Sequence, residues 1–282
     1  MRVRSGVFAA WASAWLAGEA AYDDVVSRVT GDDEPHRVTG ALLGLAGGSA
    51  SADAAAHDVG PTVPESVARH PEARSAGEVP LGWVLPVLRE QSPDGVRTVL
   101  PVPGDPRGLP GPGEFTIAAL AAGEAVTGRG IGLVPRVTEH GSELGSRTTC
   151  VLWTAYELGE PAPDPITVAE AEHDLTAATR DAASALAALD VARWRPEVAG
   201  ELARVRRGVT PDLPPGHEGR AVRLLAQADR LAAVLDLARA DAPGGAVTGA
   251  EARARDDALR PLATALRRAR IATYNAVPSR HR

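Results

Sequence analysis

The hydrophobic pattern of this 282-residue chain changes at the proline-rich segment PAPDP, residues 161–165. Before this segment, short runs of β-branched and aromatic residues alternate with glycine and proline, which is typical of strands and turns. After it, apolar residues recur every three or four positions over long stretches, which is typical of amphipathic helices. Because proline interrupts both kinds of element, we predict a domain boundary here. The predicted domains are an α/β region, residues 1–160, and a helical region, residues 167–282.

The helical region is expected to form an antiparallel bundle. Leucine and alanine recur at heptad-like spacing along three long stretches, so each stretch would present one apolar seam. Thr167 and Glu170 form the capping pattern T-x-x-E at the start of the first stretch, and Thr248 and Glu251 repeat it before the last. A shorter helix is expected to begin at Pro196, because the fixed φ of proline suits a first helical turn. Helices of this kind bury their seams by packing side by side.

The N-terminal residues have two interpretations. Two arginines followed by an apolar run resemble a secretory signal. However, apolar residues recur at spacings of three and four from Phe8 to Val29, and the phase continues past Glu19. That pattern describes one face of a single amphipathic helix, so we favour a helix over residues 8–29 of the mature protein. The run is too short and too interrupted to be a membrane span.

Residues 79–160 are expected to form a small mixed sheet with at least one helix across it. The predicted helix begins at Glu114 and is closed by Gly123. The predicted strands, each bounded by turn residues, are 83–90, 95–103, 130–139 and 148–158. The sequence therefore predicts an α+β fold with an N-terminal helix, a small mixed β-sheet region and a C-terminal antiparallel helical bundle.

The segment LPVPGDPRGLPGPG, residues 100–113, precedes the predicted helix at Glu114 and invites comparison with a phosphate-binding loop. Such a loop needs several backbone N–H groups aimed at one point, whereas the five prolines of this segment have none. Asp105 and Glu114 would also repel an anion at the start of the helix. We therefore interpret the segment as a stiff connector whose exposed edge, centred on Arg107, is suited to dock a partner protein.

The sequence predicts neither a metal site nor a bound cofactor. Glu170 and His173 have the E-x-x-H spacing of di-iron proteins, but the pattern occurs once and the apolar seam turns both side chains away from the core. Asp53 and His57 would supply only two ligands. Cys150 is the single cysteine and lies in an apolar strand. We expect it to be a small buried hydrophobe rather than a reactive thiolate.

Two groups of residues are candidates for binding. The first is a candidate binding surface in the α/β region, in which Glu139 and His140 lie in an apparent glycine-flanked turn where the histidine could act as a base. Its members are Asp105, Arg107, Glu139 and His140. The second is a basic surface on the last helix, made of Arg260, Arg267, Arg268 and Arg270.

The charge of the chain is unevenly distributed. The first 166 residues carry a net charge of −9 and the rest carry +3, which gives the −6 of the whole chain. A net charge of +3 with few aromatic residues disfavours nucleic-acid binding. We therefore expect the basic surface to contact an acidic protein surface, which includes the N-terminal half of this chain.

Three fragments resemble a family of uncharacterised, alanine-rich actinobacterial proteins. They are PVPGDPRGLPGP in the loop, GIGLVP in a predicted strand and ALDVARWRPE at the end of a helix. The resemblance covers much of residues 95–270. It implies a bacterial lineage, which suits the 30 arginines and the absence of lysine, and it implies no activity and no catalytic residue.

Two functions remain open. The first is a non-enzymatic cytoplasmic protein, an interaction or adaptor protein that binds a protein partner or a second copy of itself through the bundle and the loop at 100–113. A single cysteine suits this reducing compartment. The alternative is a small-molecule-binding enzyme with a cleft between the sheet region and the bundle, lined by the loop with Arg107, Glu139 and His140. Convergence of these three side chains in one pocket would favour the alternative.

Overall fold

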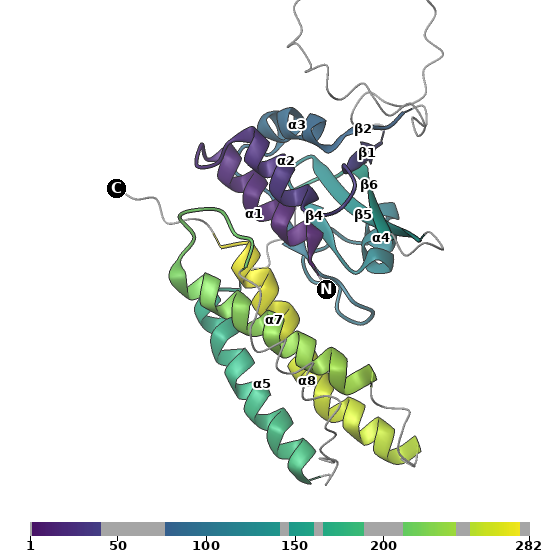
Figure 1. Ribbon diagram of the computed structural model, residues 1–282, viewed down its shortest axis with the longest axis vertical. Helices are drawn as coiled ribbons and strands as arrows, with labels where there is room; N and C mark the ends of the chain where they lie inside the picture. The colour runs from purple at the N-terminus through teal and green to yellow at the C-terminus, as the bar shows by residue number, and fades with distance from the viewer. Residues whose placement is uncertain are drawn as a thin grey trace, which may run out of the picture.

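A computed structural model describes residues 2–40, 77–141, 147–160, 166–188, 211–240 and 249–276. The described residues form a six-stranded mixed sheet with helices on both faces, and three long helices that extend away from it (Figure 1). The α+β class predicted from the sequence is confirmed. The helices are α1 (Arg4–Leu16), α2 (Tyr22–Thr30), the 3₁₀ helix η3 (Leu81–Trp83), α3 (Val84–Gln91), α4 (Glu114–Ala122), α5 (Val168–Ala188), α7 (Gly219–Ala240) and α8 (Gly249–Tyr274). The strands are β1 (Arg37–Thr39), β2 (Val79–Pro80), β3 (Arg97–Val99), β4 (Ala125–Thr127), β5 (Ile131–Gly141) and β6 (Arg147–Glu157).

The N-terminal segment begins with a helix, as predicted, but the single helix expected over residues 8–29 is wrong. The chain forms two helices, α1 and α2, with a turn between them in which Gly18 has a φ of +79°. The N–H of Gly18 donates to the carbonyl of Trp15 (2.9 Å) and the N–H of Glu19 to that of Ala14 (2.8 Å), which closes α1. The apolar spacing continued through this turn because α1 and α2 both contribute residues to the same core.

The sheet has the strand order β2-β1-β6-β5-β4-β3. β1 pairs with β6 in parallel and the other pairs are antiparallel, with the long β5–β6 hairpin at the centre. The strand predicted over 83–90 is wrong, because these residues form the end of η3 and most of α3. Pro86 stands in the first turn of α3, where it costs no helical hydrogen bond, and Val84, Leu85 and Leu88 are buried on one face. A short apolar run of this kind fits a strand and a buried helix equally well.

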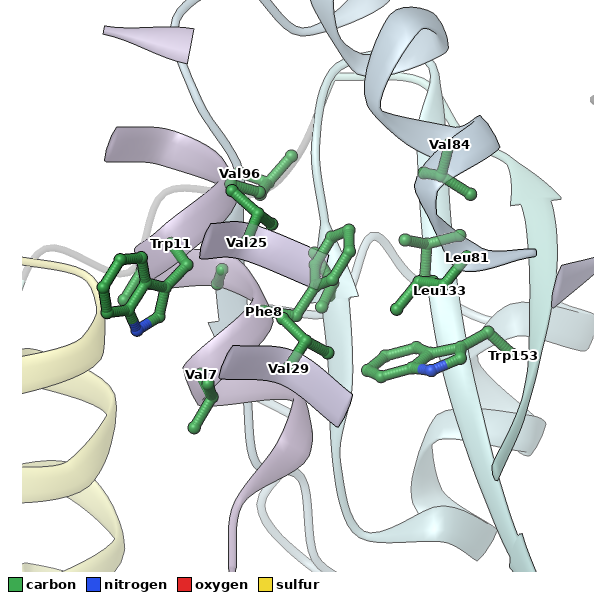
Figure 2. Packing of buried hydrophobic residues seen from close by; sticks show 14 of the residues in the cluster. Val7, Phe8, Trp11, Val25, Val29, Leu81, Val84, Val96, Leu133 and Trp153 are labelled. Carbon is green, nitrogen blue, oxygen red and sulfur yellow. The ribbon is translucent and has the colours of Figure 1, made fainter. Parts of the chain in front are cut away.

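The two faces of the sheet are covered by different helices. Odd-numbered residues of β5 and β6, such as Leu133 and Trp153, point toward α1 and α2, where Phe8 and Trp153 have ring centroids 5.4 Å apart (Figure 2). Even-numbered residues face α4, where Phe115 meets Tyr156 edge-on at 5.7 Å. The helix predicted to begin at Glu114 and to end at Gly123 is confirmed as α4, and Gly123 has the expected left-handed conformation.

Helices α5, α7 and α8 pack on one another through leucine and alanine, and α8 runs antiparallel to the other two (Figure 1). The capping pattern at the start of α5 is confirmed. The N–H of Thr167 donates to Glu170 Oε2 (2.9 Å), and the N–H of Glu170 donates to Thr167 Oγ1 (3.2 Å). Glu170 is exposed and therefore lies on the solvated face that the seam predicts. The helix expected at Pro196 and the second capping pattern lie outside the described residues.

The end of α8 enters the core of the sheet region. Ile271 and Tyr274 are buried in the same cluster as Phe8 and Trp153. At this contact the Tyr274 ring lies against Gly6 of α1, where a Cβ atom would stand 2.4 Å from Tyr274 Cδ2. The helical region and the sheet region therefore share part of one core, and the division at residues 161–165 stays a prediction because that segment lies outside the described residues.

Candidate functional site

The loop of residues 100–113 connects β3 to α4 and is anchored at both ends. Leu100, Pro101 and Leu109 are buried, whereas the side chain of Val102 and most of the loop prolines are exposed. Val102 and Asp105 exchange two backbone hydrogen bonds, of 3.3 and 2.9 Å, which close a tight turn. The loop therefore presents an exposed proline-rich edge on a fixed base.

An ion-pair cluster joins this loop to α8. Arg107 donates from Nε and Nη2 to the two carboxylate oxygens of Asp105, at 2.7 Å each. Arg267 also donates to Asp105, and its Nη1 donates to the carbonyl of Leu100 at 3.0 Å. The hydrogen bonds from Arg107, followed by those from Arg267, hold the pKa of Asp105 well below its usual value. The structure thus brings together two residues of the candidate binding surface and one of the basic surface.

Beside this cluster, the residues at the end of α8 cover the edge of the sheet formed by β3. β3 is the last strand of the sheet, and Asn275, just after α8, pairs with the backbone of Thr98 as a neighbouring strand would. Thr98 N–H donates to Asn275 Oδ1 (2.8 Å), and Asn275 Nδ2 donates to the Thr98 carbonyl (3.0 Å). This joint was not predicted, because an asparagine near the end of a helix carries no signal about a strand 177 residues away.

Glu139 and His140 lie elsewhere in the molecule. Both are exposed near the end of β5, opposite Thr149 and Thr148 of β6. The turn expected around His140 is wrong, because β5 continues to Gly141. The hydrophobic pattern predicted that this strand ends at Glu139, but backbone pairing with β6 continues β5 to Gly141.

The remaining arginines of the basic surface are paired with acidic side chains of the helical region. Arg268 Nη1 donates to Asp174 at 3.0 Å, and Arg270 Nε donates to Asp229 at 2.9 Å. The last member of the surface, Arg260, is exposed and pairs with Asp257 one turn earlier on α8. The basic charge predicted for α8 is therefore largely balanced within the molecule. Among the four arginines of this surface, Arg267 is the one whose ion pair in the described residues reaches the N-terminal half, at Asp105, where a contact was expected.

A buried cluster of polar side chains around His36 was also not predicted from the sequence. His36 is almost fully buried, its Nδ1 accepts a hydrogen bond from Trp153 Nε1 (3.2 Å), and its Nε2 lies 3.3 Å from Asp33 Oδ2. Arg4 binds the same carboxylate through two hydrogen bonds. Burial lowers the pKa of His36 to about 4, so the ring is neutral near pH 7 and Nε2 carries the proton. Because the cluster is closed by protein partners, it holds β1 against β6 and α1.

Neither a metal-binding group nor a membrane-spanning helix is found among the described residues. Within the described ranges, no three histidine, cysteine, aspartate or glutamate side chains gather into a group that could hold a metal ion. No helix in the same ranges is long and apolar enough to cross a membrane. Cys150 is half-buried in β6 rather than fully buried as expected, because it lies where the β5–β6 hairpin extends beyond the core.

Comparison with known proteins identifies the family. Residues 5–170 match the family described as "Rv1486c-like protein, N-terminal domain", and residues 169–271 match "Rv1486c-like protein, C-terminal domain". The chain is 33% identical to "Uncharacterized protein Rv1486c" of Mycobacterium tuberculosis, over 95% of this chain and 94% of that protein. It is 33% identical to "Uncharacterized protein MAV321" of Mycobacterium avium and 30% identical to "Uncharacterized protein ML1804" of Mycobacterium leprae, at the same coverage. No solved structure matches. The predicted resemblance to an uncharacterised actinobacterial family is confirmed, and the chain belongs to the Rv1486c-like family.

Proposed function

We propose that this member of the Rv1486c-like family is a non-enzymatic interaction protein of the cytoplasm, which presents the loop at 100–113 to a partner protein. The observation that carries the proposal is the combination of exposure and anchoring in this loop. Its outer edge is exposed, while Asp105, Arg107 and Arg267 hold its base on α8. A surface fixed before binding loses little conformational entropy when a partner docks.

The composition of the exposed edge supports protein recognition. Val102 is 37% exposed, and Ile117, in the first turn of α4, is 70% exposed. The hydroxyl of Thr116 donates to the carbonyl of Gly111, which holds the end of the loop against α4. Exposed apolar side chains beside prolines provide area that can be buried without leaving backbone N–H groups unsatisfied. We define Val102, Ile117 and the exposed prolines between them as the loop surface.

The enzyme alternative receives less support from the geometry. Arg107 lies in the ion-pair cluster on α8, whereas Glu139 and His140 lie near the end of the β5–β6 hairpin. The pocket that the described residues form between the sheet region and α8 is lined by none of these three side chains. A shared role in catalysis requires reacting groups within hydrogen-bonding reach of one substrate.

The proposal is tested by affinity purification from an actinobacterial cell that expresses the tagged protein. Ile117→Gln removes an exposed apolar side chain from the loop surface and keeps a residue that favours helices. Val234→Gln is the matched control, because Val234 is 38% exposed on α7 and is not part of the loop surface. Since both changes lie at the surface, each is expected to alter the free energy of unfolding by less than about 0.5 kcal/mol.

The expected result is a stoichiometric partner that the wild type and Val234→Gln retain and that Ile117→Gln loses. A stoichiometric partner retained by both variants would place the binding surface elsewhere and contradict the role of the loop. Recovery of no stoichiometric partner, together with a monomer by light scattering, would contradict the interaction function itself. Cell fractionation of the same strain tests the cytoplasmic location.

A further inference from the structure

Among the described residues, β5 has a long stretch of edge that no other strand covers. β5 pairs with β6 along its whole length, from Ile131 to Gly141. On its other side, β4 pairs with it at Gly132 and Leu133. From Arg136 to Gly141 every residue of β5 is exposed, and we call this stretch the β5 edge. A strand with unpaired backbone groups along one side is a template for a further strand.

The backbone hydrogen bonds show which groups face this edge. The Ile131 carbonyl accepts from the Gly128 N–H at 2.8 Å, on the side of β4. Along an antiparallel strand, the N–H and C=O groups of successive residues alternate between the two sides. Val137 and Glu139 are, like Ile131, odd-numbered, so their backbone groups point to the same side. In the part of the chain that the structure describes, no backbone group bonds to them there.

Pro135 explains why β4 does not continue along this edge. The register of β4 would place Glu124 opposite Pro135, and proline has no N–H to donate. The Glu124 carboxylate instead accepts a hydrogen bond from the Ser5 N–H of α1 at 2.8 Å, and the chain before Glu124 forms α4. The β5 edge therefore begins where its pairing with β4 ends, and β6 holds it extended. A strand that is already extended loses little conformational entropy when a partner pairs with it.

Two exposed charges of opposite sign flank these backbone groups. Arg136 lies on the sheet face that carries α4, and Glu139 lies on the face that carries α1 and α2. In an antiparallel ladder, residues directly opposite each other point to the same face, and opposite charges at such positions attract. A strand that pairs with the β5 edge is therefore favoured if it carries a basic residue opposite Glu139 and an acidic residue opposite Arg136. Val137 lies between them and is 40% exposed, so it favours a β-branched residue opposite it.

A second copy of β5 does not supply this charge pattern. In an antiparallel pair of two copies, residues whose backbone groups face the edge must stand opposite each other. If Glu139 stands opposite Val137 of the copy, Arg136 stands opposite His140. If Glu139 stands opposite Glu139, two like charges meet, and if Val137 stands opposite Val137, Glu139 stands opposite Pro135. None of these registers places an acidic residue against a basic one, so the charges favour a different chain.

We propose that the β5 edge binds an extended segment of a partner protein by strand addition. The segment runs antiparallel to β5, and its basic residue opposite Glu139 is followed three positions later by an acidic residue opposite Arg136. Backbone hydrogen bonds to Val137 and Glu139 supply affinity, and the two charge pairs set the register. The β5 edge shares no residue with the loop surface, so this proposal does not depend on the function proposed above.

The test measures binding of a synthetic peptide, Thr-Thr-Lys-Thr-Val-Glu-Thr with both ends blocked, to the full chain by NMR titration over the millimolar range. In one antiparallel register its lysine stands opposite Glu139 and its glutamate opposite Arg136. The control peptide has glutamine at both charged positions, so it keeps the backbone groups and removes both charge pairs. Hydrogen exchange locates the peptide: the amides of Val137 and Glu139 should become protected, whereas the amide of Thr138 faces β6 and is protected already.

Protein variants separate the charges from the backbone groups. Glu139→Gln and Arg136→Gln each remove one charge of the β5 edge, and Asp256→Asn removes an exposed carboxylate on α8 as the control. Val137→Pro removes one N–H that faces the edge, and Val137→Thr is its matched control because it keeps that N–H and a β-branched side chain. Proline is tolerated where a strand faces no partner, so Val137→Pro should keep its melting transition.

The expected result is that the charged peptide binds more tightly than the glutamine peptide. Glu139→Gln and Arg136→Gln should each weaken binding of the charged peptide about two- to fivefold and leave the glutamine peptide unaffected, as Asp256→Asn should leave both. Val137→Pro should weaken both peptides about tenfold or more, and Val137→Thr should retain them.

Several outcomes would overturn the proposal. They are no binding of the charged peptide, protection of amides elsewhere than in the β5 edge, or undiminished binding by a folded Val137→Pro. If Val137→Pro fails to fold, equal affinity of Glu139→Gln and the wild type for the charged peptide refutes the pairing. A dimer by light scattering that the glutamine variants retain and a folded Val137→Pro loses would show that a second copy occupies the edge. The peptide test uses purified protein and no residue of the loop surface, so its failure leaves the function proposed above unaffected.

Discussion

Replacing Asn275 by aspartate tests how α8 is joined to the sheet. In the wild type, Oδ1 accepts from the Thr98 N–H at 2.8 Å and Nδ2 donates to the Thr98 carbonyl at 3.0 Å. Aspartate has nearly the same shape, so Asn275→Asp leaves packing unchanged. A carboxylate keeps the first bond, but it has no proton for the second and places a negative oxygen against the carbonyl.

The size of the effect follows from the lost bond. A net hydrogen bond contributes about 0.5–1.5 kcal/mol, and leaving a partly buried carbonyl without a donor costs about 1–3 kcal/mol. We therefore expect Asn275→Asp to lower the free energy of unfolding by about 1–3 kcal/mol at pH 7. The assay is urea unfolding followed by tryptophan fluorescence, because Trp11 and Trp153 lie in the core that the joint completes.

The pH dependence of this effect distinguishes a lost donor from other causes. A protonated carboxyl group can both accept and donate, so the folded state favours protonation and raises the pKa of the introduced carboxyl group above its unfolded value of about 3.9. Its stabilising contribution is complete below the unfolded pKa and is lost as the pH rises through the folded pKa. The deficit relative to wild type should therefore be small near pH 4 and complete at pH 7.

The control is Ser184→Asp at an exposed position on α5, which adds the same charge away from the joint. Its effect on the free energy of unfolding should stay within about 0.5 kcal/mol. A deficit for Asn275→Asp that is equal at pH 4 and pH 7 would refute the assignment of the second hydrogen bond.

Three further predictions concern the buried contacts. Burial lowers the pKa of His36 to about 4, so the folded state binds the His36 proton less readily than the unfolded state. The free energy of unfolding should therefore fall by up to about 3 kcal/mol as the pH drops from 6.5 to 4. In urea unfolding, His36→Gln should remove this dependence on pH. Burial raises the pKa of Glu124, whose carboxylate accepts a hydrogen bond from the Ser5 N–H at 2.8 Å. Glu124→Gln keeps an acceptor without a buried charge, so the melting temperature of this variant at pH 8 should equal or exceed that of the wild type. A melting temperature well below that of the wild type would contradict this reasoning. Gly6→Ala should destabilise the protein by about 1–3 kcal/mol in thermal unfolding, because a Cβ atom would meet the Tyr274 ring at 2.4 Å, whereas glycine to alanine in a helix otherwise stabilises.

Much of the fold followed from local patterns in the sequence. The capping pattern at Thr167 and the left-handed Gly123 involve residues within one or two turns of each other, so both could be predicted. The long β5–β6 hairpin was also predictable in outline from its β-branched residues. The segment 83–90 was assigned to the wrong element, because a short apolar run buries equally well as a strand or a helix until its neighbours are known.

The candidate site was predictable only in part. The loop at 100–113 was predicted to be a stiff connector from its five prolines, and the structure shows that Leu100, Pro101 and Leu109 in it are buried. Asp105 and Arg107 were predicted to share a binding surface, which stays a prediction. Their partner Arg267 lies 162 residues from Asp105, and nothing in the spacing connects them. Arg267 was assigned to the basic surface, which was expected to contact acidic groups, together with arginines that the structure pairs with nearby carboxylates.

Most helices and strands and the absence of an internal disulfide could be predicted from the sequence. Helix and strand patterns depend on residues close together in the chain, and a single cysteine has no partner within it. Which charges are neutralised, which strand edge is covered and where α1 and α8 end became clear only from the folded structure. The joint at Asn275 and the cluster at Asp105 both depend on contacts between distant segments. Such contacts form when the whole core packs, so their energies depend on geometry that no local pattern records.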